Sequence, residues 1–174
     1  MKKIIFCFLI SLTISGCGSS KPNVGQSGDS PSWFLMPPTS SSYLYGVGMG
    51  KKQNPSLSKK TATARARAEL SQAVSVKVTT MMKDFMQESG IGENAQALEF
   101  TESVTKQVSN NVLNGSVIKK AYSAKDGTIY IMVELSLESV KNETLNAARK
   151  EEALFNEFKA KQGFDELEKT LNDM

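Results

Sequence analysis

The sequence predicts an α+β fold: a small three-stranded sheet packed by two central helices, followed by a long C-terminal helix. Residues 43–50 alternate with period two, as a strand does. Two further alternating segments flank an Asp-Gly pair between residues 117 and 135, which is typical of a β-hairpin. Apolar residues recur at helical spacing over residues 62–85, 93–112 and 136–171.

The composition is that of one folded domain, in which an enzyme would have to work with carboxylates, Ser, Thr, Tyr and Lys alone. A chain of 174 residues with 40% apolar and 22% charged residues is ordinary for a globular protein. It has no histidine, and its cysteines are Cys7 and Cys17, so a zinc site and the commonest acid–base side chain are both missing. We therefore expect no enzyme, no catalytic residue, no metal and no cofactor.

The charges argue against nucleic acid as a partner. Lysine and arginine total 21, and aspartate and glutamate total 18. Lys2 and Lys3 fall in the leader described next, so the rest of the chain is close to neutral. The basic pairs are interpreted as solvated faces, with a weak role near phospholipid or cell-wall anions left open; they are Lys51-Lys52, Lys59-Lys60 and Lys119-Lys120.

Residues 1–16 are predicted to be a lipoprotein signal peptide. Two lysines precede the apolar segment Ile4–Ile14, which is too short to cross a bilayer that needs about 20 residues. The next residues, Ser15-Gly16-Cys17, complete what looks like a lipobox. We expect peptidase cleavage between Gly16 and Cys17 and lipid attachment at the Cys17 sulfur. An ordinary secretory leader with a cysteine near its cleavage site is the alternative.

Residues 17–30 are predicted to be the lipidated cysteine and a flexible tether, because they are mostly glycine and small polar residues. Such a tether reaches about 20 Å. Residues 31–174 then form a single α+β domain. Its first segment, residues 32–38, is an apolar clasp that ends at two prolines. Trp33 either anchors this clasp on the core or stays exposed for a partner.

The first strand presents glycine on one face. Gly46, Gly48 and Gly50 alternate with the larger side chains of Tyr45 and Val47. No complete phosphate-binding glycine pattern is present. A glycine face admits another backbone closely, and the alanine-rich helix that follows is the expected neighbour.

That helix begins in the segment 54–58, where a serine is the expected N-cap. Its buried stripe is expected to comprise Ala62, Ala66, Leu70, Ala73, Val74, Val78, Met81, Met82 and Phe85. Met81, Met82 and Met86 are interpreted as core packing rather than as a soft-metal site. The second helix is expected to bury Leu98, Val104, Val108 and Val112.

The hairpin segments 117–124 and 128–135 flank Asp126-Gly127, which predicts a two-residue type I′ turn. Pairing outward from that turn places Tyr122 opposite Ile131, Lys120 opposite Val133 and Ile118 opposite Leu135, on a buried face shared with Ile129. The other face places Lys119 opposite Glu134 as an ion pair.

The last helix is expected to start at a Ser136 cap and to run to the end of the chain. Its apolar stripe is Val140, Ala147, Leu154, Phe155, Phe158, Phe164, Leu167 and Leu171. A helix of this length extends past a three-stranded sheet, which predicts self-association or docking of an envelope protein. The alternative is that the chain folds back at Gly163.

In order along the chain, these features resemble the Lpp-twenty type of small outer-membrane lipoprotein, a group that includes flagellum-associated lipoproteins. The features are the lipobox at Cys17, the clasp Pro31-x-Trp33 with Pro37-Pro38, the strand 43–50, the Ala/Arg helix 62–70, the hairpin 117–135 and the closing segment 164–168. The resemblance implies a compact α+β envelope domain, and the functional residue that carries over is Cys17.

The resemblance also implies a location. Gly18 follows Cys17, where sorting signals of this class use aspartate for inner-membrane retention, so the outer membrane is expected. The expected function is a non-catalytic, lipid-anchored structural or interaction protein of the bacterial outer membrane, in an envelope or flagellar-motor assembly. The alternative is a periplasmic binding module for a hydrophobic or cell-wall ligand, or an activator of a cell-wall enzyme.

Overall fold

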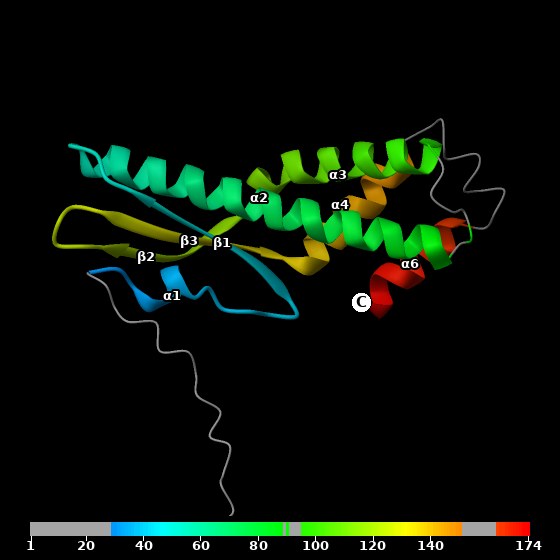
Figure 1. Ribbon diagram of the computed structural model, residues 1–174, viewed down its shortest axis with the longest axis horizontal. Helices are drawn as coiled ribbons and strands as arrows, with labels where there is room; N and C mark the ends of the chain where they lie inside the picture. Colours follow the sequence, from blue (N-terminus) through cyan, green and yellow to red (C-terminus); the bar gives the residue numbers. More distant parts are fainter. Residues whose placement is uncertain (1–28, 89, 91–94, 151–162) are drawn as a thin grey trace, which may run out of the picture.

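The computed structural model describes residues 29–88, 90, 95–150 and 163–174, which form an α+β domain (Figure 1). Its elements are α1 Ser32–Leu35, β1 Tyr43–Gly50, α2 Pro55–Glu88, α3 Ala95–Gly115, β2 Val117–Ser123, β3 Ile129–Ser136, α4 Leu137–Lys150 and α6 Gly163–Asp173. The predicted fold class and the three predicted strands are confirmed. None of the helices described is long and apolar enough to cross a bilayer.

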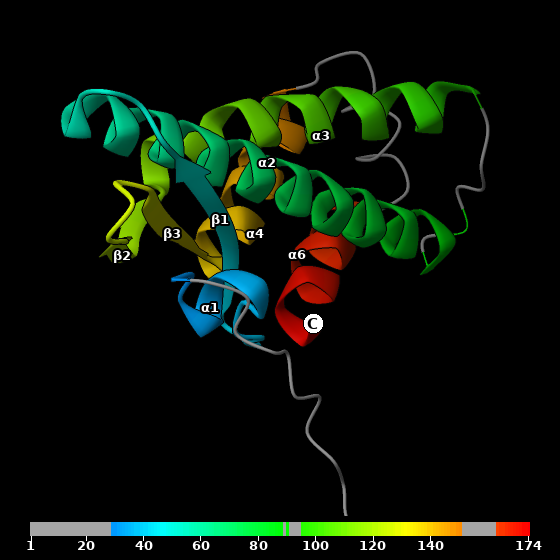
Figure 2. The same cartoon turned by 60° about the vertical axis from the view of Figure 1, so that its left-hand side comes forward.

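The three strands form one antiparallel sheet in the order β1-β3-β2. The central strand β3 turns Ile131, Val133 and Leu135 toward the helices, where they join the main hydrophobic core. These are residues that the alternation in the sequence assigned to the buried face. Figure 2 shows α2 and α3 on one side of the sheet and the short α1 on the other.

The glycine face of β1 lies directly against the first half of α2. A Cβ atom built on Gly46 would lie 2.3 Å from the Ala66 carbonyl oxygen, and one on Gly48 would lie 2.3 Å from the Ala62 carbonyl oxygen. Gly50 meets the preceding helical turn in the same way. No side chain fits at these distances, so the two backbones are in contact. The predicted close approach of helix and strand is confirmed.

Asn54, rather than a serine, caps α2. Its Oδ1 accepts a hydrogen bond from the Ser56 N–H at 2.8 Å, and Pro55 occupies the first helical position, where its missing N–H costs nothing. Ser58 is fully buried. Its Oγ accepts a hydrogen bond from the Lys52 N–H at 2.9 Å, which ties the β1–α2 connection to the first helical turn.

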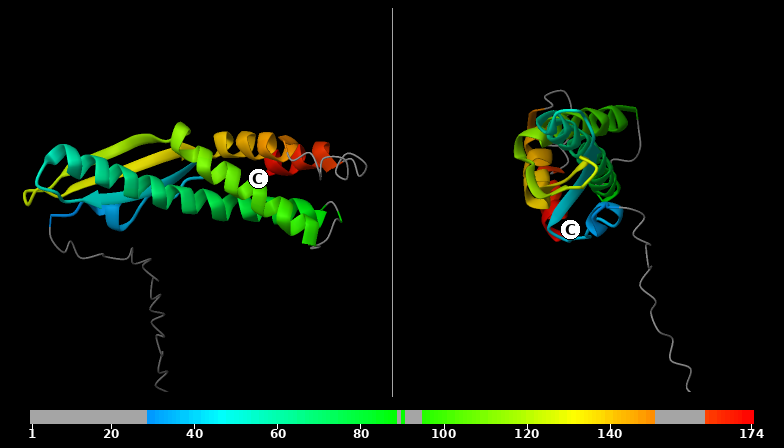
Figure 3. Two further views of the ribbon diagram at one scale, coloured as in Figure 1. Left: turned by 90° about the horizontal axis from the view of Figure 1, so that it is seen from above. Right: turned by 90° about the vertical axis from the view of Figure 1, so that its left-hand side faces the viewer.

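The helix α2 continues for 34 residues, about 50 Å at 1.5 Å per residue. An eight-residue strand is only about 27 Å long, so the second half of α2 extends past the sheet. There it packs against α3 and α6 (Figure 3). Met81, Met82 and Phe85 are fully buried in this part, together with Phe100 of α3. The interpretation of the methionines as core packing is confirmed.

The buried stripe of α3 differs from the predicted one at its first position. Ala97, Phe100, Val104 and Val108 are buried, whereas Leu98 is 51% exposed. Leu98 is one residue beyond Ala97 and therefore points about 100° away around the helix. Val112 was also predicted to belong to the stripe, but its side chain is not among those that the structure describes.

The β2–β3 loop contains three residues rather than the predicted two. The Ala124 N–H donates to the Thr128 carbonyl at 2.8 Å, and the Gly127 N–H donates to the Ala124 carbonyl at 3.1 Å. Gly127 has a φ of +85°, the left-handed conformation that closes a three-residue loop built on a type I turn. The Asp126-Gly127 pair marks a turn as expected, but one of a different length.

The longer loop shifts the pairing of β2 with β3, so the predicted register is wrong. The observed pairs are Tyr122–Tyr130, Ala121–Ile131, Lys120–Met132, Ile118–Val133 and Val117–Glu134. An irregularity between Ile118 and Lys120 adds a second shift, which is what an extra residue in a bulge produces. Ile118 and Tyr122 are 42% and 38% exposed rather than buried.

The predicted long C-terminal helix is wrong. Ser136 caps α4 as expected, because its Oγ accepts a hydrogen bond from the Ser139 N–H at 3.0 Å. However, α4 has only 14 residues and α6 only 11. The helix α6 begins at Gly163 and buries Leu167 and Leu171 in the core.

The folding back of α6 onto α2 matches the alternative expected from Gly163. Gly163 is the first residue of α6, a position that suits glycine because it is a poor residue for the interior of a helix. The predicted stripe residues Leu154, Phe155 and Phe158, and the side chain of Phe164, lie outside the described residues. Because α6 buries its apolar residues Leu167 and Leu171 in the same domain, it does not need the partner that was expected of a long last helix.

We expect Gly48→Ala to destabilise the domain by about 1–3 kcal/mol, because an added methyl group would push β1 away from α2. The measurement is the free energy of unfolding from urea denaturation of a chain that begins at Gly18, with circular dichroism as the probe. The matched control is Gly115→Ala, whose new Cβ would meet the tip of the flexible Leu135 side chain at 3.1 Å. Equal stability of the two variants would contradict the proposed backbone contact.

Candidate functional site

The predicted cleavage site and lipid attachment site, Gly16 and Cys17, lie outside the described residues. The first residue described is Asp29, and it is fixed to the β2–β3 hairpin. The Tyr122 hydroxyl donates to Asp29 Oδ1 at 2.9 Å, and the Lys125 N–H donates to Asp29 Oδ2 at 2.7 Å. These hydrogen bonds lower the pKa of Asp29, the Lys125 N–H contributing most. Asp29 therefore fixes where the chain from Cys17 reaches the domain.

Sequence reasoning missed Asp29, because it assigned residues 17–30 to a flexible tether. The local sequence gives no signal for this contact, since Asp29 and its two partners are more than 90 residues apart. Only the fold brings them together.

The hairpin loop beside Asp29 contains a second anchored carboxylate. Asp126 Oδ2 accepts a hydrogen bond from Lys51 Nζ at 2.9 Å, and Asp126 Oδ1 accepts one from the Thr128 N–H at 2.9 Å. The Thr128 hydroxyl donates to Asp126 Oδ2 as well. Together they lower the pKa of Asp126 from 3.8 to about 2, with the Lys51 hydrogen bond as the largest cause. The loop is thereby joined to the start of the β1–α2 connection.

The clasp containing Trp33 covers the middle of the outer sheet face, the face opposite α2. The Phe34 ring packs edge-on against Tyr130 with centroids 4.8 Å apart. Met132 is fully buried although it is not part of the main core, and the contact of α1 with β3 accounts for this. Trp33 itself is half-buried, which agrees more with an anchor on the sheet than with an exposed partner contact.

The outer sheet face also contains the predicted ion pair. Lys119 Nζ lies 3.1 Å from Glu134 Oε1, and this hydrogen bond raises the pKa of Lys119. Glu134 is only 8% exposed, and its Oε2 atom is buried without a hydrogen-bond partner. Tyr45 and Val117 pair with Glu134 from the two neighbouring strands. The carboxylate is thus enclosed between an aromatic ring and an aliphatic side chain.

Exposed apolar side chains border this part of the sheet. We define the strand patch as Tyr43 of β1 together with Val117 and Ile118 of β2. Their exposed fractions are 42%, 56% and 42%. Because β2 is an edge strand, one side of its backbone has no neighbour within the sheet. Edge strands of this kind are where added strands and partner proteins bind.

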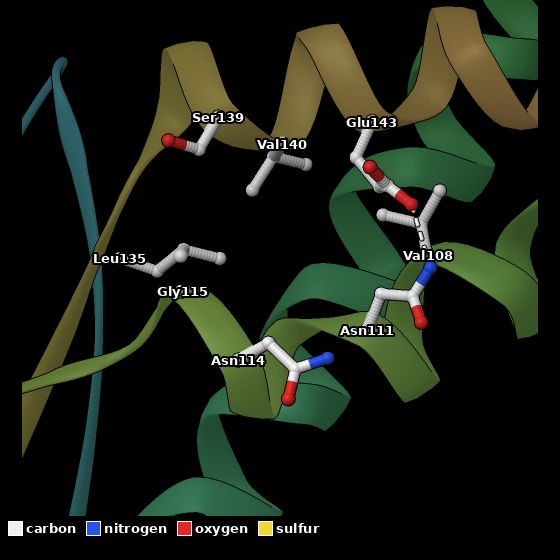
Figure 4. Close-up of a pocket in the computed structure, with 8 residues that line it drawn as sticks. All are labelled: Val108, Asn111, Asn114, Gly115, Leu135, Ser139, Val140 and Glu143. Carbon is white, nitrogen blue, oxygen red and sulfur yellow. Dashed lines mark hydrogen bonds between the residues drawn. The ribbon is translucent and has the colours of Figure 1, made fainter.

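A pocket of about 420 Å³ lies between the end of α3 and the start of α4 (Figure 4). Its apolar floor consists of Val108, Leu135 and Val140, and its polar rim consists of Asn111, Asn114, Gly115, Ser139 and Glu143. Asn111 Nδ2 donates to Glu143 Oε1 across one wall. The pocket is open to solvent on one side, so it does not enclose an apolar ligand. No acidic cluster able to hold a metal ion occurs in the described part of the chain.

We expect Lys51→Gln to raise the pKa of Asp126 from about 2 toward 3.8, because the largest cause of the shift is removed while the Thr128 hydrogen bonds remain. A lowered carboxyl pKa stabilises the folded loop above pH 4, and this stabilisation is lost as the pH falls toward 2. The measurement is an NMR pH titration of the side-chain carboxyl carbon.

The control for this titration is Lys52→Gln, since Lys52 is not among the causes of the Asp126 shift. An unchanged Asp126 pKa in the Lys51→Gln chain would show that the Lys51 hydrogen bond is absent in solution.

Comparison with known proteins identifies the family. The family model described as LPP20 lipoprotein matches residues 31–136, a range that contains the clasp, all three strands and the first two long helices. The matched range does not include Cys17. Neither a curated protein nor a solved structure matches the chain significantly. Because the match covers more than half of the 174 residues, the protein belongs to the LPP20 lipoprotein family.

Proposed function

We propose that the protein is a non-catalytic, lipid-anchored interaction protein of the bacterial outer membrane. In this proposal Cys17 carries the acyl chains and the domain faces the periplasm. The domain presents the strand patch to another protein of an envelope or flagellar-motor assembly. The observation that carries the proposal is membership of a lipoprotein family together with a lipobox at residues 14–17.

The anchor is supported by chemistry and by geometry. The small residues before Cys17 suit a signal peptidase, and two or three acyl chains give the stable membrane binding that one chain does not. Eleven residues separate Cys17 from Asp29, a span that corresponds to about 20 Å for a flexible chain. Since Asp29 is fixed to the hairpin, the domain would stay within that distance of the lipid surface.

The interaction role is supported by the exposed apolar side chains of the strand patch. Val117 and Ile118 lie on an edge strand, and Tyr43 lies on the same sheet one strand beyond β3. Tyr43 and Val117 lie on the outer face and Ile118 on the opposite face of the edge strand, so a partner that adds to β2 could contact Val117 and Ile118 from both faces. The neighbouring Lys119 would supply a polar contact, since its side chain is 50% exposed beside the patch.

The α3–α4 pocket supports the second candidate, a binding module for a cell-wall ligand. Two asparagines and a glutamate around an apolar floor suit a sugar or amide better than an acyl chain. The volume of about 420 Å³ is within the range of small-molecule sites. This candidate differs from the first in the surface that it uses.

We expect Cys17→Ser to release the protein from the outer-membrane fraction, because the serine oxygen cannot form the thioether to lipid. The matched control is Cys7→Ser, which removes the other cysteine of the chain and leaves the lipobox intact. Mass spectrometry of the mature N-terminus and membrane fractionation are the two measurements.

Retention of the Cys17→Ser protein in the outer membrane, or an unacylated wild-type N-terminus, would contradict the anchor. In the same strains, motility and leakage of periplasmic protein separate the two kinds of assembly. Loss of motility alone would favour a flagellar role, and leakage alone would favour a general envelope role.

We expect a photocrosslinking amino acid at Ile118 to give a discrete adduct with an envelope protein in living cells. The control position is Val76, which is 69% exposed on α2 away from the strand patch. A third position, Asn114, tests the pocket rim. Adducts of equal strength at Val76 and Ile118 would contradict the strand patch, and a cell-wall fragment captured at Asn114 would favour the binding module.

A further inference from the structure

We propose that the end of the domain nearest the tether binds the surface of an anionic phospholipid membrane directly. The surface, here named the basic end, consists of Lys51, Lys52, Lys59, Lys60, Lys125 and the exposed Leu57. It is formed by the β1–α2 connection, the first turns of α2 and the β2–β3 loop. This inference rests on the proposed Cys17 anchor and adds an orientation to it.

The fold brings these lysines together from two distant parts of the chain. The register pairs Gly50 at the end of β1 with Ile129 at the start of β3, so the β1–α2 connection lies beside the β2–β3 loop. The 2.9 Å ion pair between Lys51 and Asp126 joins them. All five lysines of the basic end are exposed. Figure 1 shows the start of α2 and the hairpin loop at the same end of the molecule.

The charge of this end is strongly one-sided. From Ser30 through Ala68 the chain contains four lysines and two arginines but no aspartate or glutamate. The carboxylates described at this end are Asp29 and Asp126, and both are already hydrogen-bonded within the domain. The net charge of the basic end is therefore positive, although the chain after the leader is close to neutral.

The far end of the domain carries a net negative charge. Acidic side chains outnumber basic ones over the last turns of α2, the first turns of α3 and α6; the described ones are Asp84, Glu88, Glu99, Glu102, Glu166, Glu168 and Asp173. The charge is thus separated along the long axis of the molecule. A charge distribution of this kind orients a protein in the field of an anionic surface.

An apolar side chain lies among the lysines. Leu57 is 53% exposed in the first turn of α2, between Lys52 and Lys59 along the chain. Met49, at the end of β1, is 45% exposed beside the same connection. Lysines around one or two exposed apolar side chains are the arrangement by which peripheral proteins contact lipid headgroups, with the apolar group entering the interface.

The tether identifies the occupant as a membrane rather than a free anion or a nucleic acid. Asp29, where the chain from Cys17 reaches the domain, is bonded to Lys125 and Tyr122 of the hairpin. In the proposed anchored protein, a flexible stretch of this length would reach about 20 Å, which would keep this end, rather than the acidic end, next to the lipid. The electrostatic attraction then acts within a few Debye lengths, each about 8–10 Å at physiological salt.

The test uses the full acylated lipoprotein reconstituted in two kinds of vesicle. One is phosphatidylcholine alone, and the other is phosphatidylcholine mixed with phosphatidylglycerol. A polarity-sensitive fluorophore is attached to a cysteine at one of two exposed glutamines near opposite ends of α2, as Gln53→Cys or Gln87→Cys. The introduced thiol is the free one, because Cys17 is acylated and Cys7 is removed with the leader.

We expect a blue shift of the Gln53 probe that requires phosphatidylglycerol and disappears in 1 M salt, where the Debye length falls to about 3 Å. The Gln87 probe should not change. Replacing four lysines of the basic end by glutamine should lower the ratio of molecules whose basic end contacts the lipid to molecules whose basic end does not, at least about tenfold. These replacements are K51Q, K52Q, K59Q and K60Q, and the matched control is K83Q, K106Q, K150Q and K169Q.

Three results would overturn the inference. They are a Gln53 signal that is the same in both vesicles, an equal loss in the two lysine variants, and a Gln53 response to soluble cell-wall fragments that matches the vesicle response. Failure of the anchor is distinguished separately, because an unacylated protein would not remain on phosphatidylcholine vesicles at all. If the protein stays bound to both kinds of vesicle but the Gln53 probe shows no blue shift, the Cys17 anchor is supported and binding by the basic end is contradicted.

Discussion

The fold depends on the contact between the glycine face of β1 and the small residues of α2. Glycine at positions 46, 48 and 50 lets the helix backbone approach where any larger residue would push it away. Ala62 and Ala66 complete the contact from the helix side. This places α2 over the sheet at one fixed distance and angle. Since α2 is continuous over 34 residues, the same contact also sets the position of the helical half that extends past the sheet.

The periodicity of the sequence predicted most elements of the fold but not all of their boundaries. Alternation located the three strands, and the glycines of β1 next to alanines at helical spacing predicted which helix covers which strand. The last helix was predicted to extend past the sheet, but the described α6, with 11 residues, does not. It is α2 that extends past the sheet, and α3 and α6 of the same chain cover it.

Other features could not be predicted, because different structures satisfy the same local pattern. Asp126-Gly127 fits both a two-residue and a three-residue loop, and a change of one residue alters every pair in the hairpin. The Asp29 contact depends on partners more than 90 residues away, and no local signal reports such a contact. Cys17 was predicted from its neighbours alone, and that prediction does not depend on the fold.

The attachment of Asp29 to the hairpin has a mechanical consequence. A pulling force between membrane and domain would enter at Asp29, and the first bonds it meets are two hydrogen bonds and the packing of the short α1. Residues 29–42, once unravelled, would span at most about 45–50 Å while the sheet and its helix contact stay intact. Release of the clasp would therefore lengthen the connection between Cys17 and the domain without unfolding the sheet.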